Sequence, residues 1–187
     1  MARVAIFASG EGTNAEAIIR HLQEEGRHTV TLVLTNRPQA GVVSRAETLG
    51  VPVLVFDRNG LQDPDKVLHR LKDAGVDMVV LAGFLWLMPP HIVQAFEGAM
   101  LNIHPALLPK FGGKGMYGMH VHNAVKAAGE IETGISIHLV SAEYDRGRVI
   151  FQARCSVSFS DTPEEIGNKV RALELHHYPL VISQYLG

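Results

Sequence analysis

The residues that decide the fold are Val4-Ala5-Ile6-Phe7-Ala8, followed at once by Ser9-Gly10-Glu11-Gly12-Thr13-Asn14. An apolar run without alternation is typical of a parallel strand that is buried on both faces. The glycine turn leads into a helix that we expect over residues 14–25, closed by Gly26. Unpaired N–H groups and the positive end of the dipole at such a helix start bind anions, so this unit predicts a phosphate site.

Strands and helices alternate outward from this unit. Further strands are expected at residues 30–34, 53–56, 78–82, 99–101, 135–140 and 149–158. Helices are expected at residues 41–49, at 63–74 with Asp63 as N-cap, at 90–96, at 120–128, and from Thr162 to near Gly187. This alternation predicts an α/β fold, a doubly wound, mostly parallel sheet of about seven strands with helices on both faces.

Composition limits the class of protein. A chain of 187 residues that is 47% apolar is expected to form one domain with a full core. The single cysteine, Cys155, fits a reducing cytoplasm, and no apolar run approaches the roughly 18 residues of a membrane span. A formal charge of −2 without a basic run favours small-molecule ligands over nucleic acid or membrane. The sequence leaves monomer and homodimer open.

The run Leu101-Asn102-Ile103-His104-Pro105-Ala106-Leu107-Leu108-Pro109 is not explained by packing alone. Its two prolines end the preceding strand. Asn102 and His104 are two residues apart, so on an extended backbone their side chains lie on the same side. An amide and an imidazole together suit hydrogen-bond donation to an oxygen that gains negative charge. The alternative is a capping asparagine and a satisfied core histidine.

A candidate carboxylate partner is Asp145, in the stretch Glu143-Tyr144-Asp145-Arg146-Gly147 just past an expected strand. Next to His104 it would favour the imidazolium and fix the orientation of the ring. Alone, it would be an ordinary solvated turn residue.

Other histidines carry weaker signals. His120 and His122, with His104 and Asp145, have the residue types of a metal site, but no metal is expected because nothing fixes the pair on one strand. His138 alternates with isoleucines on an expected strand, which predicts a hydrogen-bonded structural histidine.

The stretch from Gly10 to Ala15 also satisfies the dinucleotide fingerprint G-x-G-x-x-A. The second strand is followed by Asn36-Arg37 where an acidic residue should hold the ribose, which fits only a phosphorylated cofactor. Glu11 would repel a pyrophosphate if it pointed into the turn. A single terminal phosphate held by Gly12, Thr13 and Asn14 fits better, although an NADP-dependent oxidoreductase and a non-catalytic nucleotide-binding module stay open.

With these motifs in place, and with Val80-Leu81-Ala82-Gly83-Phe84, the chain resembles the phosphoribosylglycinamide formyltransferases nearly end to end. The resemblance implies a formyltransferase fold in one domain, 1–187, with a Rossmann-like phosphate-binding half at 1–100 and a catalytic and folate-binding half at 101–187. It implies transfer of a formyl group from 10-formyltetrahydrofolate, as co-substrate, to the amine of phosphoribosylglycinamide in purine biosynthesis.

The resemblance also assigns site residues. Asn102, His104 and Asp145 match the catalytic trio, and the ribonucleotide site matches Gly12, Thr13, Asn14, Arg171 and Glu174. The folate pocket matches Leu85, Trp86, Leu87, Met88, Asn102, Ser141, Ala142, Glu143, Tyr144 and Asp145.

The chain departs from the family pattern at three places. Trp86 stands where the family often has arginine, and Arg146 and Arg148 replace small residues. Residues 114–118 resemble an insertion within the glycine-rich segment 110–118, which we interpret as a lid. A relative that acts on another substrate, as the methionyl-tRNA formyltransferases and formyltetrahydrofolate hydrolases do, stays an alternative.

Overall fold

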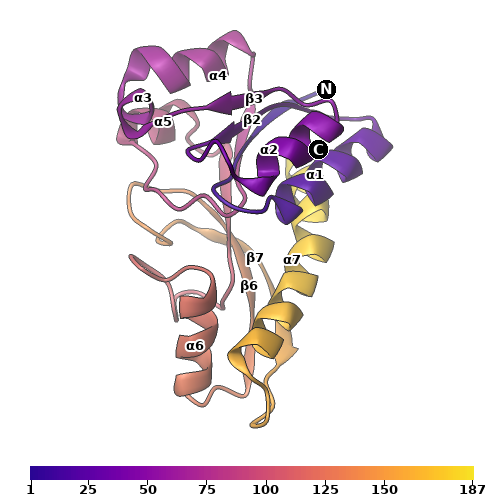
Figure 1. Ribbon diagram of the computed structural model, residues 1–187, viewed down its shortest axis with the longest axis vertical. Coiled ribbons are helices and arrows are strands. Elements are labelled where there is room, and N and C mark those ends of the chain that lie inside the picture. Colours follow the sequence, from indigo (N-terminus) through magenta and orange to yellow (C-terminus); the bar gives the residue numbers. More distant parts are fainter.

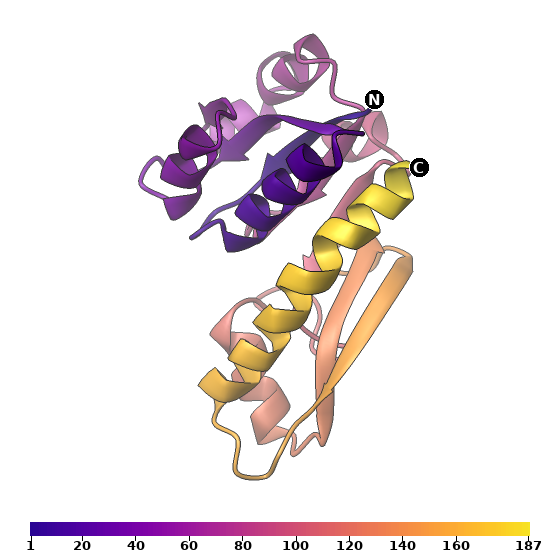
Figure 2. The same ribbon diagram turned by 90° about the vertical axis from the view of Figure 1, so that its right-hand side faces the viewer.

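The computed structural model describes all residues, 1–187, and is built on a single sheet of seven strands (Figures 1 and 2). The strands are β1 (Arg3–Phe7), β2 (Thr29–Thr35), β3 (Val53–Val55), β4 (Met78–Leu81), β5 (Met100–His104), β6 (Glu132–Leu139) and β7 (Val149–Ser156). Their order across the sheet is β3-β2-β1-β4-β5-β6-β7. The first five are parallel, and β6 and β7 are antiparallel to their neighbours. The predicted doubly wound, mostly parallel sheet is confirmed.

The helices lie on both faces of this sheet. They are α1 (Thr13–Glu25), α2 (Gly41–Thr48), α3 (Arg58–Gln62), α4 (His69–Asp73), α5 (Pro90–Ala95), α6 (Met119–Ala127) and α7 (Pro163–Leu186). One face carries a large core with residues from α1, α2, α6 and α7. The opposite face carries a smaller core with residues from α3, α4 and α5. None of the helices has the length and apolarity needed to cross a membrane.

The alternation of side chains along β1 explains the two cores. Val4 and Ile6 pack into the large core, whereas Ala5 and Phe7 pack into the smaller one. Successive side chains on a strand point to opposite faces, so a strand covered on both faces must be apolar throughout. All four of these residues are fully buried.

The segment between β3 and β4 differs from the single helix expected over residues 63–74. Asp63 does cap the helix start, because its carboxylate accepts a hydrogen bond from the Asp65 N–H at 3.0 Å. The first turn after it, η1 (Pro64–Leu68), is π-helical and only then continues as α4. The sequence also gave no indication of α3, a short helix capped by Asp57, whose carboxylate accepts from Gly60 N.

The long helix α7 connects the two ends of the molecule (Figure 2). The expected start at Thr162 is confirmed by a capping box, in which the Thr162 hydroxyl accepts from Glu165 N and the Glu165 carboxylate accepts from Thr162 N. Farther along, the Tyr178 hydroxyl lies 3.0 Å from the Leu81 carbonyl and 3.3 Å from the Leu101 carbonyl. Helix α7 is therefore tied to the carboxyl end of β4 and to the first residues of β5.

We predict that Tyr178→Phe lowers the free energy of unfolding by about 1–2 kcal/mol, because the two buried carbonyl groups that share its one hydroxyl proton lose that donor. Tyr185→Phe is the matched control on the same helix, since its hydroxyl donates to Gly98 O from a side chain that is 38% exposed. That change should cost less than about 0.5 kcal/mol. Urea denaturation of both variants measures the difference, and equal losses would contradict the role given to Tyr178.

Candidate active site

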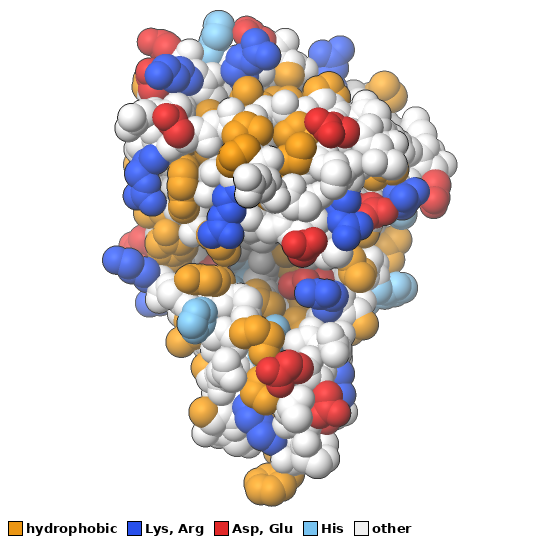
Figure 3. Space-filling view, in the orientation of Figure 1, with side chains coloured by type: hydrophobic (Ala, Val, Ile, Leu, Met, Phe, Trp, Pro, Cys, Tyr) orange, Lys and Arg blue, Asp and Glu red, His pale blue; other side chains and the backbone are white.

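A cavity of about 730 Å³ opens beside the carboxyl ends of β4 and β5, a volume usual for small-molecule sites. The space-filling view shows this hollow near the middle of the molecule, with acidic and basic side chains around it (Figure 3). The wall is formed by the loop after β4, the end of β5, the loop that precedes α6, the loop after β6, and the first half of α7. Lining residues include 83–88, 102–105, 113–119, 141, 143–145, 164, 167, 168, 170, 171 and 174.

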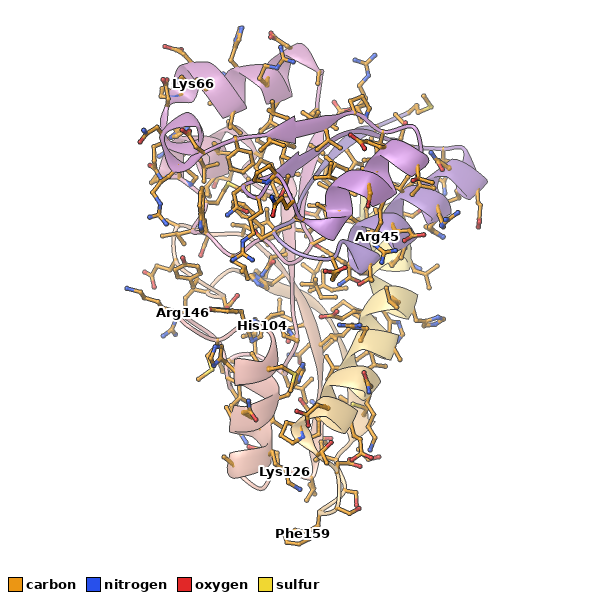
Figure 4. The ribbon with its side chains drawn as sticks, viewed as in Figure 1. Arg45, Lys66, His104, Lys126, Arg146 and Phe159 are labelled. Atoms are coloured by element: carbon orange, nitrogen blue, oxygen red, sulfur yellow. The ribbon has the colours of Figure 1, made fainter.

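The structure brings Asn102, His104 and Asp145 together on this wall. His104 Nδ1 lies 3.4 Å from Asp145 Oδ2, and the Gly113 N–H donates to that same oxygen at 2.9 Å. Asp145 has a φ of 55°, a left-handed conformation that non-glycine residues rarely adopt. Figure 4 shows His104 near the middle of the molecule, close to the start of α6. The predicted amide, imidazole and carboxylate therefore face one cavity.

His138 is a fourth member of this cluster, and the sequence had not predicted that it lies there. The structural hydrogen bond that was expected exists, from Nδ1 to the Leu139 carbonyl at 2.8 Å. With its proton on Nδ1, the ring accepts through Nε2 from Asn102 Nδ2 at 3.0 Å. The same Nε2 lies 3.6 Å from Asp145 Oδ1. His138 thus orients the Asn102 amide. The sequence could not predict this contact, because it depends on the pairing of β5 with β6, which places the two residues opposite each other.

Burial sets the charge of His104 and corrects an expectation. Desolvation lowers the pKa of His104 below its ordinary value and outweighs the Asp145 carboxylate and the Phe111 carbonyl, which raise it. The ring is therefore neutral in this state at pH 7, whereas the sequence led us to expect an imidazolium. Burial would raise the pKa of Asp145, but the hydrogen bond that its carboxylate accepts from the Gly113 N–H opposes burial, and overall that pKa lies below its ordinary value.

The glycine turn forms the start of α1 as predicted. Gly12 is the N-cap with a φ of 77°, and a β-carbon there would lie 2.6 Å from Val42 Cα, so glycine is required twice over. The N–H groups of Thr13 and Asn14 donate to no other atom of the protein. Glu11 lies with its carboxylate beside Gly41 and does not line the cavity, so its charge is directed away from it.

The predicted ribonucleotide residues fall into two groups. Asn14, Arg171 and Glu174 line the cavity, whereas Gly12 and Thr13 lie next to Asn14 but do not. Asn14 Nδ2 donates to Glu174 Oε2 at 2.9 Å, which joins the start of α1 to α7. Burial raises the pKa of Glu174, although the bond from Asn14 and the charge of Arg171 oppose this effect.

The predicted folate segments line the same cavity with one exception. The residues that do so are Leu85, Trp86, Leu87, Met88, Ser141, Glu143 and Tyr144, but Ala142 is exposed and does not. The Trp86 indole packs edge to face against Phe56 and Phe84. Its own face is covered by Arg58, whose guanidinium carbon lies 4.8 Å from the ring centroid. Arg146 and Arg148 are exposed and lie outside the lining, and Arg146 lies at the left of Figure 4.

Several lining residues had no signal in the sequence, among them Glu164, Gly167 and Asn168 on α7. Residues 113–118 of the glycine-rich segment 110–118 also line the cavity. His122 lines it as well, whereas His120 does not and packs edge to face against Tyr117. The structure contains no group of three or more His, Cys, Asp or Glu side chains arranged to hold a metal ion.

A neutral imidazole, a carboxylate and an amide share this cavity with the start of α1, and such a set of groups can stabilise developing charge beside an anion site. The model of the formyl transferase family matches residues 2–182. The chain belongs to the formyl transferase family.

Three relatives place the chain further. It is 43% identical, over 97% of its length, to the chloroplastic phosphoribosylglycinamide formyltransferase of Arabidopsis thaliana, of which it spans less than two thirds, 64%. It is 35% identical to the Bacillus subtilis protein of the same name, covering 100% of this chain and 96% of that one. A crystal structure of phosphoribosylglycinamide formyltransferase from Bacillus halodurans superposes with a TM-score of 0.89 at 38% identity, over 99% of this chain and 95% of that chain. These relatives do not favour the NADP-dependent alternative.

The buried histidines predict a stability that depends on pH. Desolvation, Arg171 and His104 together lower the pKa of His122, as burial lowers that of His104. Unfolded histidine binds its proton near pH 6.5, and the folded protein binds it only at lower pH. The contribution of these rings is therefore complete above about pH 6.5 and is lost as the pH falls towards the folded-state pKa values.

We expect the free energy of unfolding to fall between about pH 7.5 and pH 5.5, and His122→Asn to reduce the size of that fall because one buried ring is removed. Urea denaturation at both pH values measures it. Identical pH dependence in the unmodified protein and the variant would contradict the assignment.

Proposed function

We propose that this protein transfers the formyl group of 10-formyltetrahydrofolate to the glycinamide amine of phosphoribosylglycinamide in purine biosynthesis. Support comes from membership of the formyl transferase family and from relatives that carry that name over nearly the whole chain. The observation that carries the proposal is the single cavity, because it is lined at once by Asn14 of the glycine turn, by the Asn102, His104 and Asp145 cluster, and by residues 85–88.

The ribonucleotide would bind at the start of α1. Gly12, Thr13 and Asn14 offer free N–H groups and the positive end of the helix dipole to the phosphate. Arg171 adds a cation on the cavity wall, and Glu174, which already accepts a hydrogen bond from Asn14, is placed to accept from a hydroxyl or amine of the same substrate. In this arrangement the phosphate end is fixed and the glycinamide amine reaches towards His104.

The folate co-substrate would occupy the other end of the cavity. Leu85, Trp86, Leu87 and Met88 would supply apolar walls for a flat ring system, and Ser141, Glu143 and Tyr144 of the loop after β6 would supply polar groups at the same cavity. Exposed Arg146 and Arg148, together with Arg58 over Trp86, supply positive charge outside the lining that suits the anionic glutamate tail.

The chemistry follows from the state of the polar cluster. The amine attacks the formyl carbon, and the formyl oxygen becomes an oxyanion in a tetrahedral intermediate. The Asn102 side-chain nitrogen carries two protons. One is donated to His138 Nε2, and the other can be donated to that oxygen. A neutral His104 can take up a proton as the charge develops, and Asp145 then stabilises the imidazolium. The proton lost by the attacking amine ends on the departing folate nitrogen, so no proton is gained or lost overall.

One contact must change for this step. His104 Nε2 lies 2.8 Å from the Phe111 carbonyl, which occupies one ring nitrogen. We propose that residues 111–118 move when substrates bind and release this nitrogen, which agrees with a lid role for the glycine-rich segment. No metal is invoked, because the folate supplies the activated carbon and the protein supplies position and electrostatics.

Within one domain, residues 1–100 would bind the phosphate, and residues 101–187 would carry catalysis and folate binding. Asn14 and Glu174 join the halves directly. The partners are small molecules, and a reducing cytoplasm suits a chain with one cysteine.

The trio of variants Asn102→Ala, His104→Ala and Asp145→Ala tests this proposal. Each should reduce the rate of formyl transfer on the order of 10²-fold or more, because each removes a group that meets or supports the developing charge. His69→Ala, at an exposed residue of α4, is the control and should leave the rate unchanged. Initial rates of formyl transfer measure the effect, with circular dichroism to check folding. Near-normal turnover in all three variants would remove these residues from the chemistry.

A further inference from the structure

Ser9 is a buried hydroxyl that none of the steps above uses. It is the second residue after the end of β1, precedes the glycine turn, and is 1% exposed. Its hydroxyl donates to Asn36 Oδ1 at 2.7 Å and accepts from the Leu85 N–H at 3.2 Å. Its own N–H donates to the Gly83 carbonyl at 3.1 Å. Ser9 therefore connects the segments that follow three neighbouring strands, β2, β1 and β4.

The segment after β4 depends on these contacts. Residues 83–88 form neither helix nor strand, and their backbone groups make two hydrogen bonds to the rest of the protein. Both go to Ser9, one through its N–H and one through its hydroxyl. The hydroxyl bond holds Leu85, the residue immediately before Trp86. Without that bond the backbone of the segment keeps one hydrogen bond to the rest of the protein, from the Ser9 N–H to the Gly83 carbonyl.

The glycine turn, by contrast, is anchored elsewhere. The Gly10 carbonyl accepts from Val42 N at 3.2 Å, and the Glu11 carbonyl accepts from Arg45 Nε at 2.8 Å. The Gly12 carbonyl accepts from the Glu16 N–H at 2.9 Å within the first turn of α1. Loss of the Ser9 hydroxyl therefore leaves the attachments of the turn in place.

Asn36 fixes which way the Ser9 hydroxyl points. A hydroxyl has one proton, and when that proton is donated to Asn36 Oδ1 the lone pairs are left to accept from Leu85 N. Asn36 follows β2 at the position where a dinucleotide-binding protein would hold a ribose. Here the same position serves as an internal support.

We propose that Ser9, oriented by Asn36, is a positioning residue that sets residues 83–88 for the folate co-substrate independently of the ribonucleotide site. The inference rests on the proposed function, since it assigns those residues to the folate. The competing account is that Ser9 contributes only to general stability, in which case both substrates would be affected alike.

Ser9→Ala separates the two accounts through steady-state kinetics. The KM for 10-formyltetrahydrofolate should rise about tenfold, the effect of one buried hydrogen bond, while the KM for phosphoribosylglycinamide changes less than about twofold. The control is Ser44→Ala on α2, an exposed serine whose hydroxyl bonds only the Gly41 carbonyl, and it should change neither value. An equal rise in both KM values, or no rise in either, would overturn the proposal.

Two variants at Asn36 test the orientation. Asn36→Asp keeps an oxygen that accepts from Ser9 and should retain a low KM for the folate, whereas Asn36→Leu has similar size, loses the acceptor and should behave like Ser9→Ala. The double variant Ser9→Ala/Asn36→Leu should be no worse than Ser9→Ala, because Asn36 acts through Ser9. Equal effects of Asp and Leu, or additive effects in the double variant, would refute the role of Asn36.

Tryptophan fluorescence tests the positioning role of Ser9 without measuring activity. Trp86 is the only tryptophan and lies in the supported segment, so acrylamide quenching of its emission reports the exposure of that segment without any ligand. Ser9→Ala should increase the quenching and Ser44→Ala should not. Absence of turnover in the unmodified protein would count against the proposed function alone, whereas unchanged quenching in Ser9→Ala would count against the positioning role.

Discussion

The pairing of β5 on both edges is the constraint on which the rest of the structure depends. On one side β5 is parallel to β4, with Asn102 beside Leu81, and on the other it is antiparallel to β6, with Asn102 opposite His138. A shift of one residue in either register would turn Asn102 and His104 to the opposite face, because side chains alternate along a strand. Leu101 and Ile103 hold the register from that face, where both pack in the large core.

Burial then determines what the polar cluster can do. The core that fixes the strands also removes water from His104, whose side chain is only 4% exposed, and so keeps the ring neutral although the Asp145 carboxylate lies beside it. Asp145, whose pKa lies below its ordinary value, stays ionised and accepts a hydrogen bond from the Gly113 N–H. A neutral base next to a fixed carboxylate and a fixed amide suits a reaction in which charge develops and disappears on one oxygen. The tapered end beyond this site, with Phe159 at its tip, lies away from the chemistry (Figure 4).

The sequence was informative where one segment determines its own structure. The apolar run before Ser9, the glycine turn, the capping box at Thr162 and the spacing of Asn102 and His104 each have a local cause, and the structure has each of them. Features that depend on distant partners could not be predicted. His138 reaches the site only through strand pairing, and the charge of His104 depends on burial by several elements. No residue pattern in 64–68 distinguishes its π-helical turn from an α-helical one. The support given by Ser9 joins residues 76 positions apart.

The central claim is that one cavity holds a phosphorylated glycinamide at the glycine turn and a folate beside residues 85–88. The most direct measurement is the melting temperature of the unmodified protein with phosphoribosylglycinamide, with a folate analogue, with both together, and with NADP, since only a ligand of the folded state raises it by mass action. The account predicts that each of the first two raises the melting temperature, that the two together raise it further, and that NADP leaves it unchanged. A rise with NADP and none with the other two would contradict it.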